Sequence, residues 1–416
     1  HAWRGIMIGQ MKDLVFLDIE TTMCHQKIHL VVTNANGVIK CHREPRSLKK
    51  EIWGKILVAH NGIGFDFPVL NRVWGLKIKL HQVLDTLVLS RLLNPMRTKH
   101  SLASWGEDLG FPKTDFNKFD EYSEEMRQYC VNDVKVLERV YNQLLKEKES
   151  HGFDEESIQL EHEVCTIVSK QVSRGFRLDV EGCERLCGVL SGRMEEICER
   201  LQESFQPIVH KRVSEKTGKQ LKDSIEVFNP ASRQQISKRL QGIGWKPKKY
   251  TEKGSVIVDE SVLRDVNIPE AKLICEYLLL QKRLSQVASW IEAVSDKHRV
   301  YGKVITNGAV TGRMTHHSPN LAQIPSVHAE YGSECREQWV VDPGYKLVGI
   351  DASGLELRML AHYMEDEEYT KEIVDGDIHT KNQLAAGLDT RAKAKTFIYA
   401  FLYGAGAKKI GSITGT

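Results

Sequence analysis

The sequence predicts an α/β protein with two or three domains. Short, continuous apolar runs bounded by turn residues occur early in the chain, and such runs are typical of buried strands. Three long segments with apolar residues at helical spacing follow, at 157–175, 180–205 and 269–294. At 416 residues the chain can form several cores, and its 41% hydrophobic and 27% charged residues favour a globular protein.

Composition excludes some classes of protein and leaves others open. No run of about 18 apolar residues exists, so we expect no membrane-spanning helix. The first ten residues lack the regions of a signal peptide and are either a leader or a native extension before Met11. The nine cysteines have no zinc-site spacing, which indicates reduced thiols and a cytoplasmic protein. The net charge of +3 does not by itself indicate a nucleic-acid partner.

Residues 13–22, DLVFLDIETT, are expected to form a buried strand with two acids near its end. Strand side chains alternate, so Asp18 and Glu20 share a face and lie roughly 6.5–7 Å apart along the backbone. Two carboxylates at this spacing repel each other unless a cation lies between them. The alternative is an exposed edge strand with a polar face. The apolar run 14–17 argues against it, because a strand covered on both faces has this pattern.

Two further segments carry acids at helix positions. Residues 57–59 form an apolar strand that leads into a His-Asn-Gly turn, and Asp66 then opens a helix with Pro68 in its first turn. Residues 85–93 have helical spacing, and a helix is expected from about 123 to 148. In that helix Tyr129 and Asp133 are four residues apart and share one face. The alternatives are that Asp66 is an N-cap and that Tyr129 and Asp133 are a surface pair.

The motifs D-I-E-T, H-N-G-x-x-x-D and Y-x-x-x-D together resemble the DEDD exonuclease superfamily, in the subtype with a tyrosine, and so the proofreading domain of DNA polymerases. The resemblance implies an RNase H-like 3′–5′ exonuclease domain at 11–150, with a mixed sheet and helices. Two divalent ions about 3.5–4 Å apart suit phosphodiester hydrolysis, and oxygen ligands favour Mg²⁺ or Mn²⁺ over zinc.

The same resemblance implies roles for individual residues of this domain. Asp18 would bridge both ions, Glu20 and Asp133 would complete one of them, and Asp66 would support the other. Tyr129 would orient the attacking water, and Asn61 would hold the single-stranded 3′ end.

The middle of the chain has helices separated by a basic stretch. Gly175 is a good C′ residue, and Asp179 can cap the next helix. The element R-G-F-x-L-D at 174–179 resembles the start of the polymerase core in family-A DNA polymerases. Between residues 209 and 253 there are twelve Lys or Arg against four Asp or Glu. Such an excess could follow duplex phosphates, whereas any single lysine could belong to a solvated loop.

Residues 228–236, FNPASRQQI, match the F-N-P-x-S of family A. Ser232 can cap a helix whose N-terminus could face a phosphate. The resemblance implies the start of a palm at 151–182, a helical thumb at 183–300, and Asn229 and Ser232 among the DNA contacts.

Residues 307–325 are rich in Gly, Asn and Pro, so we expect a loop. Four of its side chains can donate to the acceptors that all base pairs share in the minor groove: Arg313, His316, Asn320 and Gln323. The alternative is a plain surface loop. The run T-G-R-x-x-x-x-x-P-N-L-x-Q-I-P resembles family A, and it implies a copying enzyme that checks base-pair shape without reading sequence.

An apolar run at 347–350 is expected to form a buried strand that ends at Asp351 and turns through Ser353 and Gly354 into a helix. On residues alone, Asp351 could hold a metal ion or cap that helix. The segment D-A-S-G-L-E-L-R resembles motif A of family A. It implies a palm at 301–366, with Asp351 bound to two ions, the Ala352 carbonyl adding an oxygen, and Glu356 closing the pocket against a ribose 2′-hydroxyl.

Residues 390–404 are expected to form one helix ended by Gly404. One stripe of this helix carries residues spaced by four: Arg391, Lys395, Tyr399 and Tyr403. The alternative is a basic amphipathic helix with core aromatics. The pattern resembles motif B of family A within incomplete fingers at 367–416. The resemblance implies that Arg391 and Lys395 bind phosphates, that His379 contacts the triphosphate, and that a base lies near Tyr399. A tyrosine at position 399 resembles relatives that accept dideoxynucleotides.

The resemblance is to podovirus (T-seven-like) phage replicative DNA polymerases, with one carboxylate motif missing. Family A uses an H-D-E turn after motif B, and no H-D-E occurs in residues 1–416. A truncated or partly disordered protein, a cleaved or intein-interrupted one, and a polymerase split over two genes are three explanations. We favour the split polymerase, in which a second polypeptide carries H-D-E.

Relatives can also carry a large thumb insertion that docks host thioredoxin as processivity factor. Only about twenty residues separate Phe205 from Phe228, so we do not expect thioredoxin dependence.

The expected function is therefore phage-type DNA synthesis on primer-template DNA from dNTPs, with proofreading, in the host-cell cytoplasm. The alternative is an exonuclease whose polymerase-like half only binds primer-template DNA. A purely structural DNA-binding protein is disfavoured, because the exonuclease acids and the motif A and B groups would all be idle.

Overall fold

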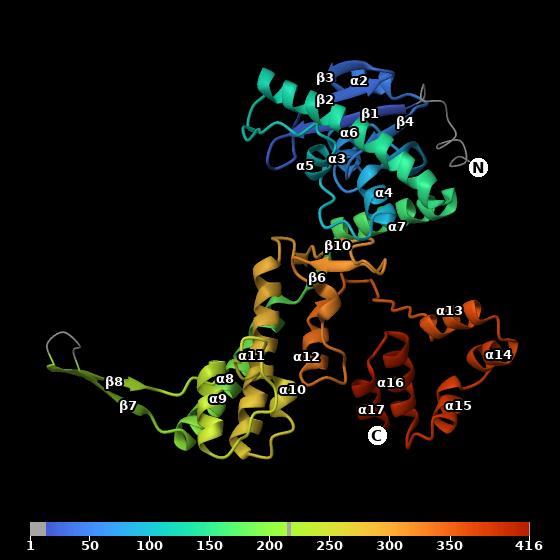
Figure 1. Cartoon of the computed structure of the whole chain (residues 1–416). Helices are drawn as coiled ribbons and strands as arrows, with labels where there is room; N and C mark the ends of the chain where they lie inside the picture. The colour runs from blue at the N-terminus through green and yellow to red at the C-terminus, as the bar shows by residue number, and fades with distance from the viewer. Residues whose placement is uncertain (1–13, 214–217, 416) are drawn as a thin grey trace. The chain divides into compact units, whose positions relative to one another are not determined.

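The computed structural model describes residues 14–213 and 218–415, and the chain divides into two compact units at Pro343 and Gly344 (Figure 1). Residues 11–13 of the expected exonuclease domain, and Glu215 and Lys216 of the basic stretch, lie outside the described residues. No helix within the described parts of the chain is both long and apolar enough to cross a bilayer.

The first unit begins with a five-stranded mixed sheet in the order β3-β2-β1-β4-β5. Its central strand, β1, pairs antiparallel with β2 and parallel with β4, and β4 pairs parallel with β5. The mixed sheet confirms the predicted α/β class. The strands are β1 (Leu14–Thr21), β2 (Ile28–Ala35), β3 (Val38–His42), β4 (Ile56–Ala59) and β5 (Val83–Asp85).

Helices cover both faces of this sheet, so β1 is buried on both sides as predicted. Leu14 and Phe16 belong to the core beneath α6, whereas Val15 and Leu17 belong to a second core with α3. Asp18 continues the face of Phe16, so the strand alternation presents its carboxylate to α6. The helices of this part are α2 (Pro45–Glu51), α3 (Asp66–Trp74), α4 (Thr86–Leu93), α5 (Leu102–Asp108) and α6 (Glu124–His151), with the 3₁₀ turn η2 (Leu80–Gln82).

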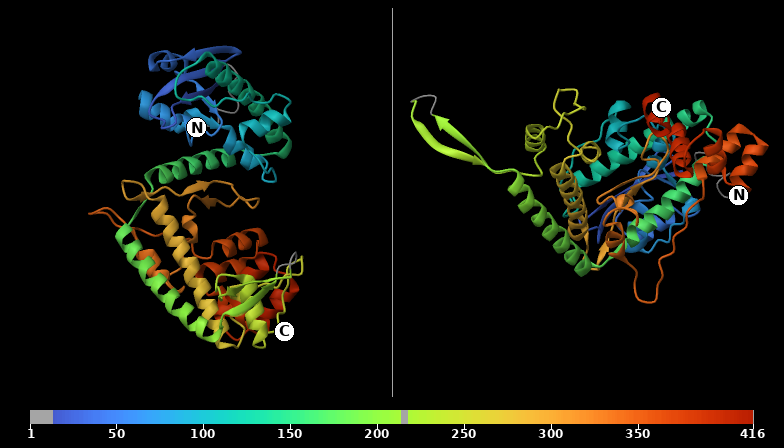
Figure 2. Two further views of the ribbon diagram at one scale, coloured as in Figure 1. Left: turned by 90° about the vertical axis from the view of Figure 1, so that its left-hand side faces the viewer. Right: turned by 90° about the horizontal axis from the view of Figure 1, so that it is seen from below.

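The remainder of the first unit is mainly helical. Helices α8 (Val180–Ser204) and α11 (Pro269–Ala293) run side by side and share a core that includes Leu190, Ile197 and Trp290 (Figure 2). Smaller helices complete it: α7 (Glu155–Arg174), α9 (Arg233–Gly242), α10 (Glu260–Leu263), α12 (Gly332–Glu337) and the 3₁₀ turn η3 (Leu321–Gln323).

Short strands join distant parts of this unit. Strand β6 (Phe176–Leu178) lies between β12 (Trp339–Val340) and β9 (Arg299–Val300), and β7 (Ile208–Val213) pairs with β8 (Gln220–Glu226) in a ribbon. The ribbon was not predicted from the sequence. Strands β10 (Lys303–Ile305) and β11 (Thr315–His317) form a hairpin, so the expectation of a loop throughout 307–325 is wrong in part.

Local capping chemistry explains why several predicted helices begin and end where they do. The side chains of Ser123, Asp179 and Ser232 accept hydrogen bonds from backbone N–H groups in the first turns of α6, α8 and α9. Gly175 ends α7 at φ 65°, a value that favours glycine. The predicted helices at 157–175, 180–205 and 269–294 are confirmed.

The second unit is helical, and one strand prediction fails there. Leu347, Val348 and Ile350 are 71%, 76% and 95% exposed, and residues 345–352 have no regular secondary structure. A strand needs a neighbour to pair with its backbone, and no described strand pairs with this segment. The helices are α13 (Leu355–Met364), α14 (Glu367–Asp375), α15 (Ile378–Ala385), α16 (Arg391–Leu402) and α17 (Ala407–Thr414).

A buried histidine joins α7 to the sheet. The Nε2 atom of His162 accepts a hydrogen bond from the backbone N–H of Asp85 at 2.9 Å, and Nδ1 lies 2.8 Å from the carbonyl oxygen of Ile158. This pattern requires a neutral ring with its proton on Nδ1, and burial lowers the pKa of His162.

We predict that His162 makes the first unit less stable in acid. Below its unfolded-state pKa of about 6.5 the unfolded chain binds a proton that the folded chain excludes. The free energy of unfolding should therefore fall with decreasing pH, by up to about 1.4 kcal/mol per pH unit from this residue. Urea titrations at pH 8, 6.5 and 5.5 should show a shallower dependence in His162→Gln. The exposed control His81→Gln should match wild type, and equal slopes in all three proteins would contradict the prediction.

Candidate active sites

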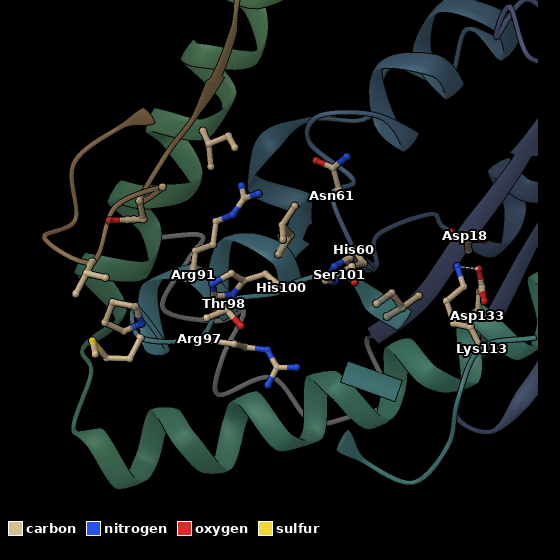
Figure 3. Close-up of a pocket in the computed structure, with 18 residues that line it drawn as sticks. Asp18, His60, Asn61, Arg91, Arg97, Thr98, His100, Ser101, Lys113 and Asp133 are labelled. Atoms are coloured by element: carbon tan, nitrogen blue, oxygen red, sulfur yellow. Dashed lines mark ion pairs between the residues drawn. The ribbon is translucent and has the colours of Figure 1, made fainter. Parts of the chain in front are cut away.

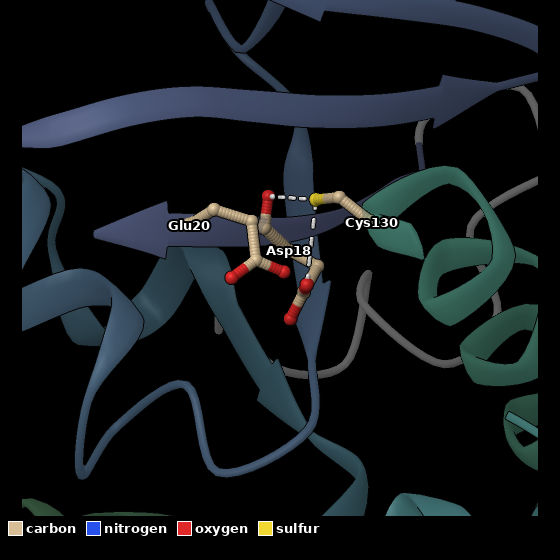
Figure 4. A group of neighbouring side chains, drawn as sticks. All are labelled: Asp18, Glu20 and Cys130. Carbon is tan, nitrogen blue, oxygen red and sulfur yellow. Dashed lines mark hydrogen bonds between the residues drawn. The ribbon is translucent and has the colours of Figure 1, made fainter. Parts of the chain in front are cut away.

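Four carboxyl groups of the first unit gather at the end of β1. Asp18 and Glu20 come from β1, Asp66 is the first residue of α3, and Asp133 lies on α6. The carboxyl of Glu20 interacts electrostatically with the other three. Ligand atoms of Asp18, Glu20 and Cys130 lie within 4.8 Å of one another (Figure 4). The structure thus brings together all four acids that the sequence singled out.

The acids raise one another's pKa values, in addition to the effect of burial. Burial and then the charge of Asp133 raise the pKa of Asp18 to about 7. Burial, followed by the charge of Asp18, raises the pKa of Glu20 to about 9. Burial and the charge of Asp18 raise that of Asp66 well above its usual range. Without a bound metal ion, the cluster therefore retains protons at neutral pH.

The donor set fits a divalent cation. It consists of carboxylate oxygens, the ligands that Mg²⁺ and Mn²⁺ prefer. The Oδ1 atom of Asp133 is buried and has no hydrogen-bond partner. A buried acceptor without a partner is costly, and a bound ion would satisfy it.

A tight turn places Asn61 and Asp66 at this site. The buried carboxylate of Asp85 accepts hydrogen bonds from the backbone N–H groups of Asn61 at 2.9 Å and Ile63 at 3.0 Å, and from that of Leu87 at 2.9 Å. Asn61 has φ 67°, which asparagine tolerates better than most residues. At Gly62 a Cβ atom would lie 2.5 Å from the Phe67 ring, so only glycine fits without movement.

Lys113 and Cys130 also enter the cluster, although the sequence did not single them out. The Lys113 Nζ lies 2.5 Å from Oδ2 of Asp133 and 4.9 Å from the centre of the Tyr129 ring. The Cys130 thiol is 3.4 Å from Oδ2 of Asp18. Cys130 follows Tyr129 directly, which was a usable signal, whereas Lys113 lies in an irregular segment without a motif.

A cavity of about 790 Å³ opens onto the acids (Figure 3). Asp18, Lys113 and Asp133 lie together in its lining, and Asn61 lines it as well. Several basic or polar side chains and part of a later loop line the rest: His60, Arg91, Arg97, His100, Ser101, Asn307 and Gly308. The basic lining suits a negatively charged ligand.

The second unit holds a separate cluster along α16. Lys395, Tyr399 and Tyr403 line a cavity of about 510 Å³ with Lys409. The Tyr403 hydroxyl donates to Oε1 of Glu356 at 2.8 Å. Three of the four residues of the predicted stripe, Lys395, Tyr399 and Tyr403, therefore face the same cavity.

Other predicted residues of this unit lie around that cluster. The ring centres of His379 and Tyr399 are 6.1 Å apart. Arg391 instead makes a two-pronged ion pair with Asp377, at 2.7 and 2.9 Å. Burial raises the pKa of Tyr399, and the charges of Glu356 and Asp351 contribute further. Asp351 and Ala352 are exposed.

The residues of the first unit that were predicted to contact DNA do not all line one cavity. Asn320 and Gln323 line a cavity of about 790 Å³ with Lys282 and Gln286, whereas Arg313 and His316 do not line it. The side chains of two more accept local backbone hydrogen bonds. Asn229 accepts from the backbone N–H of Ala231, and Ser232 accepts from that of Gln235.

Comparisons with known proteins decide the family. The model of DNA polymerase family A matches residues 195–416. The DNA-directed DNA polymerase of Escherichia phage T7 is 35% identical over 492 aligned positions, which cover 87% of this chain and 70% of the relative. The chain belongs to DNA polymerase family A.

Two further comparisons show lower sequence identity. DNA polymerase I of Chloroflexus aurantiacus is 28% identical, covering 84% of this chain and 38% of its own. The solved POL domain of Pol1 from M. smegmatis, in complex with DNA primer-template and dNTP, superimposes with a TM-score of 0.74 at 16% identity. That match covers 96% of this chain and 69% of the other, and it supports the fold.

We predict that Asp85 supports the acidic site of this family-A polymerase through the turn at 60–65. Asp85→Ala would leave several buried N–H groups without an acceptor and should lower the free energy of unfolding by about 3 kcal/mol. Urea unfolding of Asp85→Ala and Asp85→Asn measures the effect, and the amide should retain part of the stability. The exposed control Asp108→Ala should cost no more than about 1 kcal/mol. Equal losses in Asp85→Ala and the control would refute this role.

Proposed function

We propose that this family-A chain carries a 3′–5′ exonuclease in its N-terminal domain, up to about residue 150, in addition to a DNA-synthesis site. The observation that supports the exonuclease most strongly is the convergence of Asp18, Glu20, Asp66 and Asp133 beside one basic-lined cavity. The T7 relative is a DNA-directed DNA polymerase, and degradation of a mispaired 3′ end is the activity that would accompany synthesis.

Asp18, Glu20, Asp66 and Asp133 would hold two Mg²⁺ or Mn²⁺ ions. When bound, the ions supply a nucleophilic hydroxide and charge stabilisation for the leaving 3′ oxygen. Tyr129 is held in place by Lys113 and Asp133. Burial raises the pKa of Tyr129, so its phenol keeps its proton and can orient a water molecule. Asn61 lies exposed in the cavity, where it can contact the 3′-terminal nucleotide.

The exonuclease proposal predicts a large effect of one substitution. Asp18→Asn should slow degradation of 5′-labelled single-stranded DNA by more than about a hundredfold, because even partners of metal ligands contribute tenfold to a hundredfold. Gel analysis of the labelled products measures the rate. Asp120→Asn, an exposed substitution, is the matched control and should degrade DNA at the wild-type rate. Unchanged degradation by Asp18→Asn would show that another site or a contaminant cuts the DNA.

We propose that the second unit binds the incoming dNTP and holds part of the synthesis site. Lys395, Tyr399 and Tyr403 share a cavity, and Lys395 supplies a cation there for the triphosphate. Tyr403, which lines this cavity, holds Glu356 by a hydrogen bond, and Glu356 would there lie against a ribose 2′-hydroxyl. Asp351 and the Ala352 carbonyl offer hard oxygens for the same kind of ions. His379 and, after release from Asp377, Arg391 would meet the phosphates.

DNA synthesis would also require an H-D-E carboxylate, which residues 1–416 lack. The apolar, exposed segment containing Leu347, Val348 and Ile350 supports the proposal that a polypeptide with this motif pairs with it and turns it into a strand. Arg313, His316, Asn320 and Gln323 would then contact the minor groove, and the basic stretch at 209–253, with Asn229 and Ser232, would contact phosphates.

We predict that residues 1–416 alone do not extend a primer, and that adding a polypeptide with H-D-E restores extension. The physical reason is that Asp351 provides one carboxylate where the reaction needs two. Primer extension with and without the second polypeptide measures this, with Asp351→Asn as a variant that should stay inactive in both. Extension by the chain alone would refute the requirement. Degradation without any extension in either case would favour the alternative, an exonuclease whose second half only binds primer-template DNA.

A further inference from the structure

Lys113 lies beside the acids in the irregular segment at 109–123. The segment packs through Phe116, whose ring lies 5.4 Å from that of Tyr129 and 5.1 Å from that of Phe119. A hydrogen bond of 3.0 Å joins His29 Nε2 to the Phe119 carbonyl. The segment that follows Lys113 is therefore anchored to the rest of the domain, unlike the surroundings of a typical surface lysine.

The Lys113 ammonium supplies a positive charge inside the acidic cluster. It pairs with Oδ2 of Asp133 at 2.5 Å, and only 22% of the lysine side chain and 3% of the aspartate side chain are exposed. It also lies over the ring of Tyr129, and it lines the cavity beside Asp18. Lys113 thus provides positive charge among acids that would otherwise repel one another.

We propose that Lys113 sets the affinity of the exonuclease site for divalent ions, because it competes with them for Asp133. This inference rests on the proposed exonuclease function. An ion bound through Asp133 would lie close to the ammonium, and like charges at such a distance repel strongly in a partly buried site. Ion binding therefore requires Lys113 to give up its contact with Asp133. Lys113 is in this sense a positioning residue, which acts on the reaction through Asp133 and Tyr129.

A purely structural ion pair would behave differently. Breaking it would change the stability of the fold and leave the affinity for ions unchanged or weaker, because Asp133 would be less well placed. Competition instead predicts tighter ion binding when the ammonium is removed. Ion affinity is thus a readout that separates the two roles.

The test is Mn²⁺ binding without DNA, followed by the paramagnetic resonance signal of free Mn²⁺. All proteins carry Asp351→Ala, so that the second unit contributes no carboxylate from motif A. Lys113→Met should bind Mn²⁺ at least about tenfold more tightly. A charge this close changes the affinity of a carboxylate for a proton by about tenfold or more, and a metal ion at the same carboxylate should respond similarly. Lys113→Arg keeps the charge and should resemble wild type. Lys118→Met, an exposed lysine of the same segment, is the matched control.

Further measurements separate the possible failures. Thermal melting in EDTA identifies an unfolded variant, and Lys113→Gln, which retains hydrogen bonding, serves as a second neutral substitution. With Asp351 restored, the Mg²⁺ concentration for half-maximal DNA degradation should fall by the same factor in Lys113→Met. Unchanged or weaker Mn²⁺ binding in both folded neutral variants would overturn the role of Lys113. If Asp18→Ala leaves Mn²⁺ binding intact, the proposed exonuclease site itself is wrong.

Discussion

The mutual repulsion of four carboxyl groups gathered at the end of β1 is the constraint on which the first unit depends. β1 is covered on both faces, and its alternation points Asp18 and Glu20 toward α6 and Asp133. Burial and like charge together raise their pKa values, so the cluster is stable only with protons, an internal cation or bound ions. The ammonium of Lys113 and the buried, unpartnered oxygen of Asp133 are both consequences of this arrangement.

The rest of the first unit holds this repulsive cluster in place with buried hydrogen bonds. Asp85 accepts three backbone N–H groups and so orders the turn that carries Asn61 and leads to Asp66. His162 then ties α7 to the backbone of Asp85. Helix α7 leads directly into β6 and α8. The helical part of the unit is therefore joined, through His162 on α7, to the residue Asp85 that supports the acidic site. The hydrogen bonds around Asp85 and the helical core are thus connected through α7.

In the second unit, the apolar segment before motif A has no strand beside it among the described residues. Leu347, Val348 and Ile350 have the composition of a buried strand, yet they are exposed and unpaired. The helix that follows and α16 nevertheless fold as expected, because caps and helical periodicity are local. Thr390 caps α16, and Lys395, Tyr399 and Tyr403 lie on one face. Strand formation is the part that depends on a partner.

The sequence by itself determined the mixed α/β class, the long helices and the identity of the four acids, because periodicity, caps and motif spacing are local properties. It also determined the family, since motifs such as T-G-R and P-N-L are readable without coordinates. Only the tertiary structure decided that Lys113 reaches Asp133, that Asp85 holds the turn at Asn61, and that Arg391 pairs with Asp377. These contacts join residues from different elements, and their formation depends on how those elements pack, which local sequence does not encode.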